Sequence, residues 1–208
     1  RFATIQERQV GKIFDDYGID VYSALKENAI SLFILNPLTY PELSPLFGKL
    51  VIIDSKKAVS NFYTDKKNRI FYIFDEVNSY ASQSLIDLVN KSRSANITCI
   101  LAMQSLSDLN SVSPDFKEQI IENTNNYVVL RQNSSVNAES WANIFGTRKT
   151  MEATYQIKDN QETNLGTLKR TREFIYHPDE IKTLQTGQAI YVSRDTMYHA
   201  KISVQKLF

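Results

Sequence analysis

The sequence predicts an α/β fold: an open, mostly parallel sheet with helices on both faces, followed by a β-rich C-terminal extension. Three observations lead to this prediction. Between residues 29 and 131, short apolar runs alternate with helical patterns, the runs are continuously apolar, and the pattern changes after Gly146. Continuous apolar strands separated by helices are typical of parallel sheets, whose strands are buried on both faces.

Length and composition fit one globular domain with a small appendage. The chain has 208 residues, 42% of them hydrophobic, which is enough to bury a core. Its 24 basic and 23 acidic residues give a formal net charge of +1, so any contact with DNA has to be local. The apolar runs have the length of strands, and neither a membrane-spanning stretch nor a signal peptide is recognisable in these residues.

Residues 1–18 have a helix-like spacing of apolar side chains, among them Phe2, Ile5 and Ile13. We therefore expect a helix there. The sequence begins at Arg1 and the helical pattern has no recognisable start signal, so we expect these residues to belong to a longer protein.

The predicted α/β core covers residues 19–146. Its first apolar run, residues 29–35, is expected to form a strand that stops at Asn36 and Pro37, because proline is a poor continuation of a central strand. The further elements expected in this core are helices over residues 43–62, 82–92 and 116–122, a lysine-rich loop over residues 65–69, and strands over residues 70–74, 97–103 and 127–130.

Three successive strands of this core end in polar or charged residues. Asp75 and Glu76 close the strand over 70–74, Gln104 closes the next one, and Arg131 closes the last. In open α/β sheets, ligands bind at the carboxyl ends of the strands. We therefore expect these side chains to share a functional edge of the sheet.

The extension, residues 147–208, has a different sequence pattern from the core. Residues 150–172 are polar, and the asparagines and Gly166 within them indicate a loop or a hairpin tip. Pro178 is expected to open a short helix that ends near residue 184. Two final strands are expected over residues 188–193 and 197–204.

Asp75 and Glu76 are the residues most suggestive of chemistry. Adjacent carboxylates repel each other, and a divalent cation relieves that conflict. In nucleotide hydrolases, the aspartate at such a strand end holds Mg²⁺, and an adjacent glutamate orients or deprotonates the attacking water. The alternative is that the strand ends at the surface and both side chains are solvated. Gln104 would sense a γ-phosphate or position the water, or else satisfy local backbone groups.

Several segments, in matching order along the chain, resemble the type IV secretion coupling proteins of the TraG/TraD family. The wider FtsK/HerA group of DNA pumps shares the Asp-Glu pair and the strand-end glutamine. The segments that carry the resemblance are residues 71–78, 88–94, 100–106, 122–131, 144–148 and 176–189.

The resemblance implies a RecA-like P-loop-type motor domain. Family members are hexameric ATPases that use ATP and Mg²⁺ to move DNA during bacterial conjugation. It also implies single-stranded DNA with its relaxase and the secretion channel as partners. The expected location is the cytoplasmic side of a protein anchored in the bacterial inner membrane.

The phosphate-binding loop of such motors, G-x-x-x-x-G-K-[ST], is absent from this sequence. Gly11 and Lys12 are followed by Ile13 and lack the preceding glycine, so they do not form this Walker A motif. The resemblance implies that the loop lies outside the chain and that residues 1–18 end an inserted all-α domain. We expect ATPase activity of the whole protein and none of these residues alone. The alternatives are a conjugative assembly ATPase and a non-catalytic interaction module with the same fold.

Arg131 allows two interpretations. An arginine that ends a buried strand needs an acid or a phosphate, so Arg131 is either a finger reaching a neighbouring subunit's γ-phosphate or half of a salt bridge. Trp141 is interpreted as a packing residue on an amphipathic helix. The basic clusters are interpreted as solvated loops and faces; they are Lys56-Lys57, Lys66-Lys67-Arg69, Arg148-Lys149 and Lys169-Arg170-Arg172.

Overall fold

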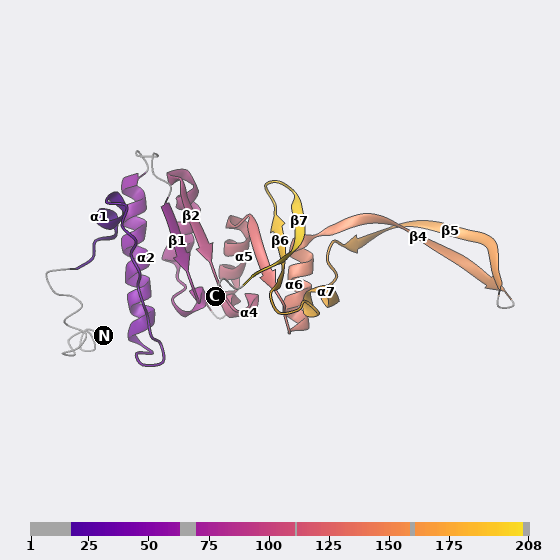
Figure 1. Cartoon of the computed structure of the whole chain (residues 1–208), viewed down its shortest axis with the longest axis horizontal. Coiled ribbons are helices and arrows are strands. Elements are labelled where there is room, and N and C mark those ends of the chain that lie inside the picture. The colour runs from indigo at the N-terminus through magenta and orange to yellow at the C-terminus, as the bar shows by residue number, and fades with distance from the viewer. Residues whose placement is uncertain (1–17, 63–69, 111, 159–160, 206–208) are drawn as a thin grey trace. The chain divides into compact units, whose positions relative to one another are not determined.

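The computed structural model of the chain describes residues 18–62, 70–110, 112–158 and 161–205. Contacts divide the chain into two compact units, residues 1–123 (unit 1) and 124–208 (unit 2), and each is described by itself (Figure 1). The boundary expected after residue 146 falls inside unit 2. The helix expected over residues 1–18, except for its last residue, and the basic loop expected over 65–69 lie outside the described residues.

Unit 1 contains a two-stranded parallel sheet. Strand β1 (Ile70–Phe74) lies beside β2 (Ile97–Leu101), with Ile70 opposite Ile97 and Phe74 opposite Leu101. Helix α3 (Gln83–Ser92) connects them and buries its Leu85, Ile86, Leu88 and Val89, as the apolar spacing predicts. This strand, helix and parallel strand confirm the expected βαβ connection.

Helix α2 (Leu43–Phe62) has the bounds that the sequence predicts. It packs against α3 and against the short helix α1 (Val21–Lys26). Its inward side chains include Ile52, which is fully buried, and Val59. Helices α4 (Leu106–Asn110) and α5 (Pro114–Asn123) complete the unit.

One face of the β1–β2 sheet is packed and the other is exposed. Ile70, Phe74 and Ile97 are buried, whereas Phe71 and Ile73 of β1 are 55% and 70% exposed. Ile100, the neighbour of Ile73 in β2, is also exposed. The continuous apolar runs predicted burial on both faces, and among the described residues only one face is covered.

The strand expected over residues 29–35 is not formed. These residues have no regular secondary structure, and Ile30 is 98% exposed. A strand is held by hydrogen bonds to a neighbouring strand, and none of the described strands pairs with this segment. The strand expected from the apolar pattern is therefore not borne out among the described residues.

Unit 2 contains a three-stranded antiparallel sheet in the order β3-β6-β7. Strand β3 (Asn126–Leu130) pairs with β6 (Gln188–Ser193), which pairs with β7 (Tyr198–Ser203). The predicted strand positions are confirmed to within two residues. The parallel arrangement expected for β3 is wrong, because its partner comes from the C-terminal extension.

Helices α6 (Ser135–Phe145) and α7 (Pro178–Lys182) pack together in unit 2. Trp141 packs on this core, with its ring 5.6 Å from that of Tyr127 and 5.8 Å from that of Phe145, which agrees with a packing role. The buried core of the unit consists of Tyr127, Val129, Ala138, Ala142, Phe145, Ile181, Leu184, Ile190 and Val192.

The remaining strands of unit 2 form a long two-stranded ribbon. Strand β4 (Thr147–Lys158) runs antiparallel to β5 (Gln161–Phe174), as Figure 1 shows. Of the two alternatives for residues 150–172, a loop or a hairpin, the structure shows the hairpin. None of the helices among the described residues combines the length and the apolarity that crossing a membrane requires.

Candidate functional site

The sheet of unit 1 brings the ends of β1 and β2 together. Beyond the last paired residues, the backbone N–H of Ala102 donates to the carbonyl of Phe74 (2.8 Å), and the N–H of Val77 donates to the carbonyl of Ala102 (3.1 Å). The turn containing Asp75 and Glu76 is thus held against the segment that follows β2. This is the edge at which the sequence places a ligand site.

The turn after β1 has an unusual backbone. Glu76 has φ 47° and ψ 48°, the left-handed region, which is costly for a residue with a side chain. The Asp75 carboxylate accepts a hydrogen bond from the Glu76 N–H at 3.0 Å, and Val77 is buried as the chain enters a short 3-10 helix. Both carboxylates are exposed at the edge of the sheet.

Tyr80 supports this turn. Its hydroxyl donates to the backbone carbonyl of Asp75 at 2.5 Å, and its ring lies 6.4 Å from that of Phe74. Burial, followed by the negative charges of Asp75 and Glu76, raises the pKa of Tyr80 to about 12. The hydroxyl therefore keeps its proton, and its role as donor, at neutral pH.

Gly48 of α2 makes room for Tyr80. A methyl group at Gly48 would lie 2.7 Å from Cβ of Tyr80, closer than non-bonded carbons approach. The close approach of α2 to the turn thus depends on this glycine. Neither Gly48 nor Tyr80 was singled out from the sequence; the available signal was a glycine inside a helical pattern.

Gln104 lies between β2 and α4. β2 ends at Leu101, two residues earlier than predicted. The next residue after Gln104, Ser105, caps α4: its hydroxyl accepts from the Asp108 N–H (3.3 Å), and its own N–H donates to the Asp108 carboxylate (3.0 Å). Gln104 is exposed. No hydrogen bond joins its side chain to Asp75 or Glu76 within the described part of the chain.

Asp75 and Glu76 have the chemistry of Mg²⁺ ligands. Magnesium in nucleotide sites is held by one or two carboxylates and completed by phosphate oxygens and water. No group of three or more His, Cys, Asp or Glu side chains among the described residues is arranged to hold a metal ion. The donors present fit an ion that arrives with a nucleotide and do not form a cage for a permanently bound metal.

Arg131 occupies a different setting from the one expected. It follows β3, which belongs to the antiparallel sheet of unit 2, and its side chain is exposed. The premise that a buried strand end forces Arg131 to find a partner is therefore wrong. Its neighbour Gln132 continues the chain with an N–H that donates to the carbonyl of Ile181 (3.4 Å).

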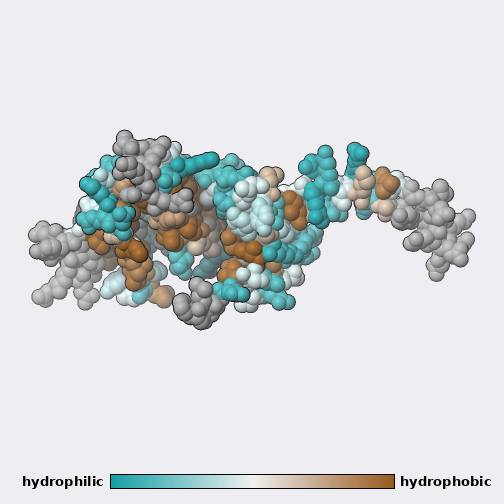
Figure 2. Space-filling model, turned by 45° about the horizontal axis from the view of Figure 1, so that its top comes forward, coloured by the Kyte–Doolittle hydropathy of each residue, from teal (hydrophilic) through white to brown (hydrophobic). Residues whose placement is uncertain are grey.

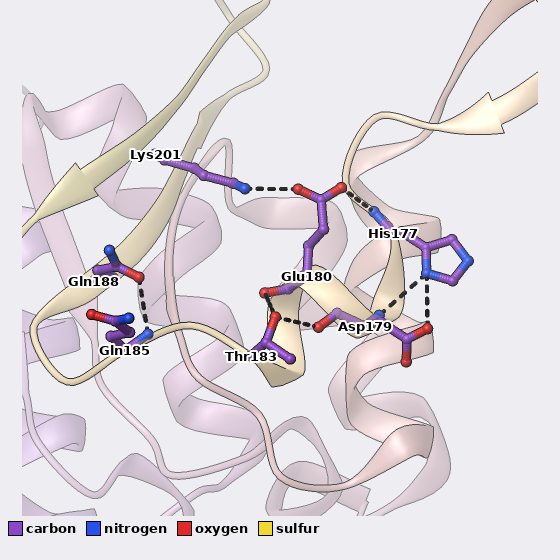
Figure 3. Close-up of polar contacts among 7 residues, drawn as sticks. All are labelled: His177, Asp179, Glu180, Thr183, Gln185, Gln188 and Lys201. Carbon is purple, nitrogen blue, oxygen red and sulfur yellow. Dashed lines mark hydrogen bonds and ion pairs between the residues drawn. The ribbon is translucent and has the colours of Figure 1, made fainter.

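The closing segment of unit 2 is held by a helix cap (Figure 3). His177 is the N-cap of α7: its Nδ1 accepts from the Asp179 N–H (3.3 Å), while Glu180 accepts from the His177 N–H (3.2 Å). The other oxygen of Glu180 forms an ion pair with Lys201 of β7 at 2.7 Å. This capping box explains why a histidine precedes Pro178 and why a glutamate lies two residues after it.

Part of the chain matches a known protein family. The family model described as the TraM recognition site of TraD and TraG matches residues 69–186. An uncharacterized protein of Mycoplasma pneumoniae is 28% identical over 152 residues, which are 73% of this chain and 84% of that protein.

Solved structures of the conjugative coupling protein TrwB resemble the chain. The unbound form has a TM-score of 0.62 at 21% identity, over 74% of this chain and 36% of that chain. TrwB in complex with ADP and Mg²⁺ has a TM-score of 0.60 at 20% identity, over 80% of this chain and 39% of that one. The chain thus spans less than two fifths of the solved relatives. The likeness confirms the predicted α/β, RecA-like fold class.

Proposed function

Because the chain belongs to the TraG/TraD family of conjugative coupling proteins, we propose that it is the C-terminal part of a motor domain that uses ATP hydrolysis to drive DNA transfer. The observation that carries this proposal is the turn after β1. There, Asp75 and Glu76 are exposed in a strained conformation beside the end of β2.

The proposed roles follow from the chemistry of the side chains. Asp75 would hold the Mg²⁺ that accompanies ATP. This Mg²⁺ would neutralise the negative charge on the phosphates. Glu76 orients the attacking water and accepts its proton, and Gln104 lies at the same edge to contact the terminal phosphate or that water. Tyr80 fixes the Asp75 carbonyl and so positions the turn.

We propose that the phosphate-binding loop lies in a part of the protein outside these residues. The uncovered face of β1 and β2, with Phe71 and Ile73 exposed, offers an apolar surface on which further strands and helices of the motor can pack. The exposed apolar residues over 29–35 add to the surface that such elements could cover. The unbound TrwB structure, of which the chain covers 36%, supports a larger motor.

The family also suggests where the protein acts and with what. We propose a hexamer anchored in the bacterial inner membrane, with this part on the cytoplasmic side. Its partners would be single-stranded DNA carrying a relaxase and the components of a secretion channel. TrwB, a coupling protein that has been solved with ADP and Mg²⁺, supports the assignment of ATP and Mg²⁺.

The test is ATP hydrolysis by the purified whole protein, with and without single-stranded DNA. We expect turnover that DNA stimulates, and none from the 208 residues alone, because the phosphate cradle is missing from them. Deleting the gene should abolish conjugative DNA transfer and leave the assembly of the channel intact. Loss of channel assembly would indicate an assembly ATPase, and turnover by these residues alone would contradict the proposal.

A further inference from the structure

The two faces of the β4–β5 ribbon differ in charge. Cross-strand neighbours are Lys149 with Arg172, Met151 with Arg170, and Ala153 with Leu168. Because side chains alternate along a strand and paired residues share a face, these six residues lie on one side, which we call the basic face. It has three cations and no carboxylate in its described part.

The opposite face is electrically balanced. There, Arg148 stands opposite Glu173, and Glu152 stands opposite Lys169. Each cation on this side has an acid as its cross-strand neighbour, which is the arrangement expected of a solvated ribbon. The sequence predicts that both basic clusters of the ribbon are solvated. The register separates their cations into two that face an acid and three that do not.

The basic face also exposes apolar side chains. Met151 is 65% exposed and Leu168 is 73% exposed, and Figure 2 shows hydrophobic and hydrophilic side chains next to one another on the ribbon. Cations interleaved with exposed apolar groups are typical of a binding surface.

We propose that the basic face is a contact site for the backbone of a nucleic acid. Guanidinium groups match phosphate geometry, and Arg170 and Arg172 are two positions apart on one strand, or roughly 6.7 Å. The chain's net charge of +1 gives no general attraction for polyanions, so a local set of cations is needed.

This inference rests on the proposed function in DNA transfer, which makes DNA the polyanion that the protein has to hold. An acidic protein segment is the competing occupant. The phosphate contacts distinguish them, because binding to nucleic acid releases condensed counterions and its affinity falls with salt by a slope that counts the contacts.

The experiment compares two double variants of the whole protein that each remove two cations from the same ribbon. Lys149→Gln with Arg170→Gln changes the basic face, and Arg148→Gln with Lys169→Gln changes the balanced face. Binding of a fluorescent 30-nucleotide single strand is measured by anisotropy from 50 to 300 mM salt. Arg170→Lys with Arg172→Lys preserves the charge, and circular dichroism with melting curves checks the fold of each variant.

We expect the basic-face variant to bind about 10–30-fold more weakly near 100 mM salt, with a salt slope reduced by about 1.4, since each lost contact on single-stranded DNA contributes about 0.7. The balanced-face variant and the lysine variant should keep the slope. The inference would be overturned if both double variants lost DNA affinity equally or if the basic-face variant kept its salt slope. It would also be overturned if the protein bound poly-glutamate in place of DNA.

Failure of this inference is distinguishable from failure of the proposed function. If the basic-face variant binds DNA normally and still supports DNA transfer in mating assays, the contact site is wrong and the motor function stands. If the unaltered whole protein neither binds DNA nor hydrolyses ATP, the proposed function fails as well.

Discussion

Tyr80 donates its hydroxyl to the backbone carbonyl of Asp75 at 2.5 Å, and this contact joins the acidic turn to the packing of unit 1. The ring of Tyr80 lies between Phe74 and α2, where Gly48 leaves space for it. The turn that contains the strained backbone of Glu76 is thus supported by the half-buried Tyr80.

Tyr80→Phe removes the hydrogen bond to Asp75 and leaves the packing unchanged. We expect the free energy of unfolding, measured in urea, to fall by about 1 kcal/mol. In the whole protein, ATP turnover should fall because the turn loses its anchor. Tyr191→Phe is the matched control, since Tyr191 donates to Asn126 in unit 2 at 3.0 Å. If both variants affect turnover alike, Tyr80 does not position the site.

Gly48→Ala places a methyl group 2.7 Å from Cβ of Tyr80. Overpacking of this kind costs about 1–3 kcal/mol, against a gain of about 1 kcal/mol from the better helix propensity of alanine. We expect Gly48→Ala to lower the stability, and we expect this loss to disappear in a Tyr80→Gly background, which removes the Cβ that the methyl group meets. A double-mutant cycle in urea measures this coupling. If the effects of the two changes simply add, the contact between residues 48 and 80 is not the cause of the lost stability.

Glu180→Gln tests the cap of α7. Glutamine still accepts from the His177 N–H but loses the charge that pairs with Lys201. The hydrogen bond from Lys201, followed by that from the His177 N–H, lowers the pKa of Glu180 from its ordinary value of 4.5. The stabilisation from this charge is therefore complete above pH 4.5 and is lost as the pH falls through the folded-state pKa.

The stability difference between Glu180→Gln and the unaltered protein should be at most about 1 kcal/mol at pH 7, because the pair is exposed. It should shrink as the pH falls through the folded-state pKa of Glu180. Melting curves at a series of pH values below 7 provide the measurement, and a difference that does not change with pH would assign the effect to packing instead of charge.

Arg131→Ala should leave stability unchanged within about 0.5 kcal/mol, as is usual for a surface position, since the side chain is exposed. If Arg131 acts on the neighbouring subunit's phosphate, whole-protein subunits with Arg131→Ala and with Glu76→Gln are each inactive. Mixing them should then restore part of the ATP turnover, because some interfaces combine an intact Glu76 with an intact Arg131. No recovery on mixing would remove Arg131 from the site.

Local patterns predicted most elements of the fold, because their own residues encode them. The apolar spacing of α3 and the proline that opens α7 are examples: each depends on residues of the helix itself. The pairing of β3 depended on a partner distant in sequence, which local patterns do not identify. The segment over 29–35 has no partner among the described residues, and β3 pairs with β6, about sixty residues later in the sequence.

The candidate site was predicted in part. Asp75 and Glu76 were recognisable because two acids end an apolar run, and the hydrogen bonds between Phe74, Ala102 and Val77 bring the two strand ends together as expected. The support from Tyr80 and Gly48 was missed because it depends on how α2 approaches the turn. The two faces of the ribbon needed the cross-strand register, which the polar sequence of residues 150–172 leaves open.

The role of Glu76 is the central claim, and nucleotide binding and hydrolysis by the whole protein test it together. Glutamine keeps the size and hydrogen bonding of Glu76 but cannot accept a proton, so Glu76→Gln should bind ATP with Mg²⁺ normally and lose at least about 100-fold in turnover. Asp75→Ala should instead weaken the binding of Mg²⁺-ATP itself. Near-normal turnover by Glu76→Gln would contradict the account and leave Glu76 as a structural residue of the turn.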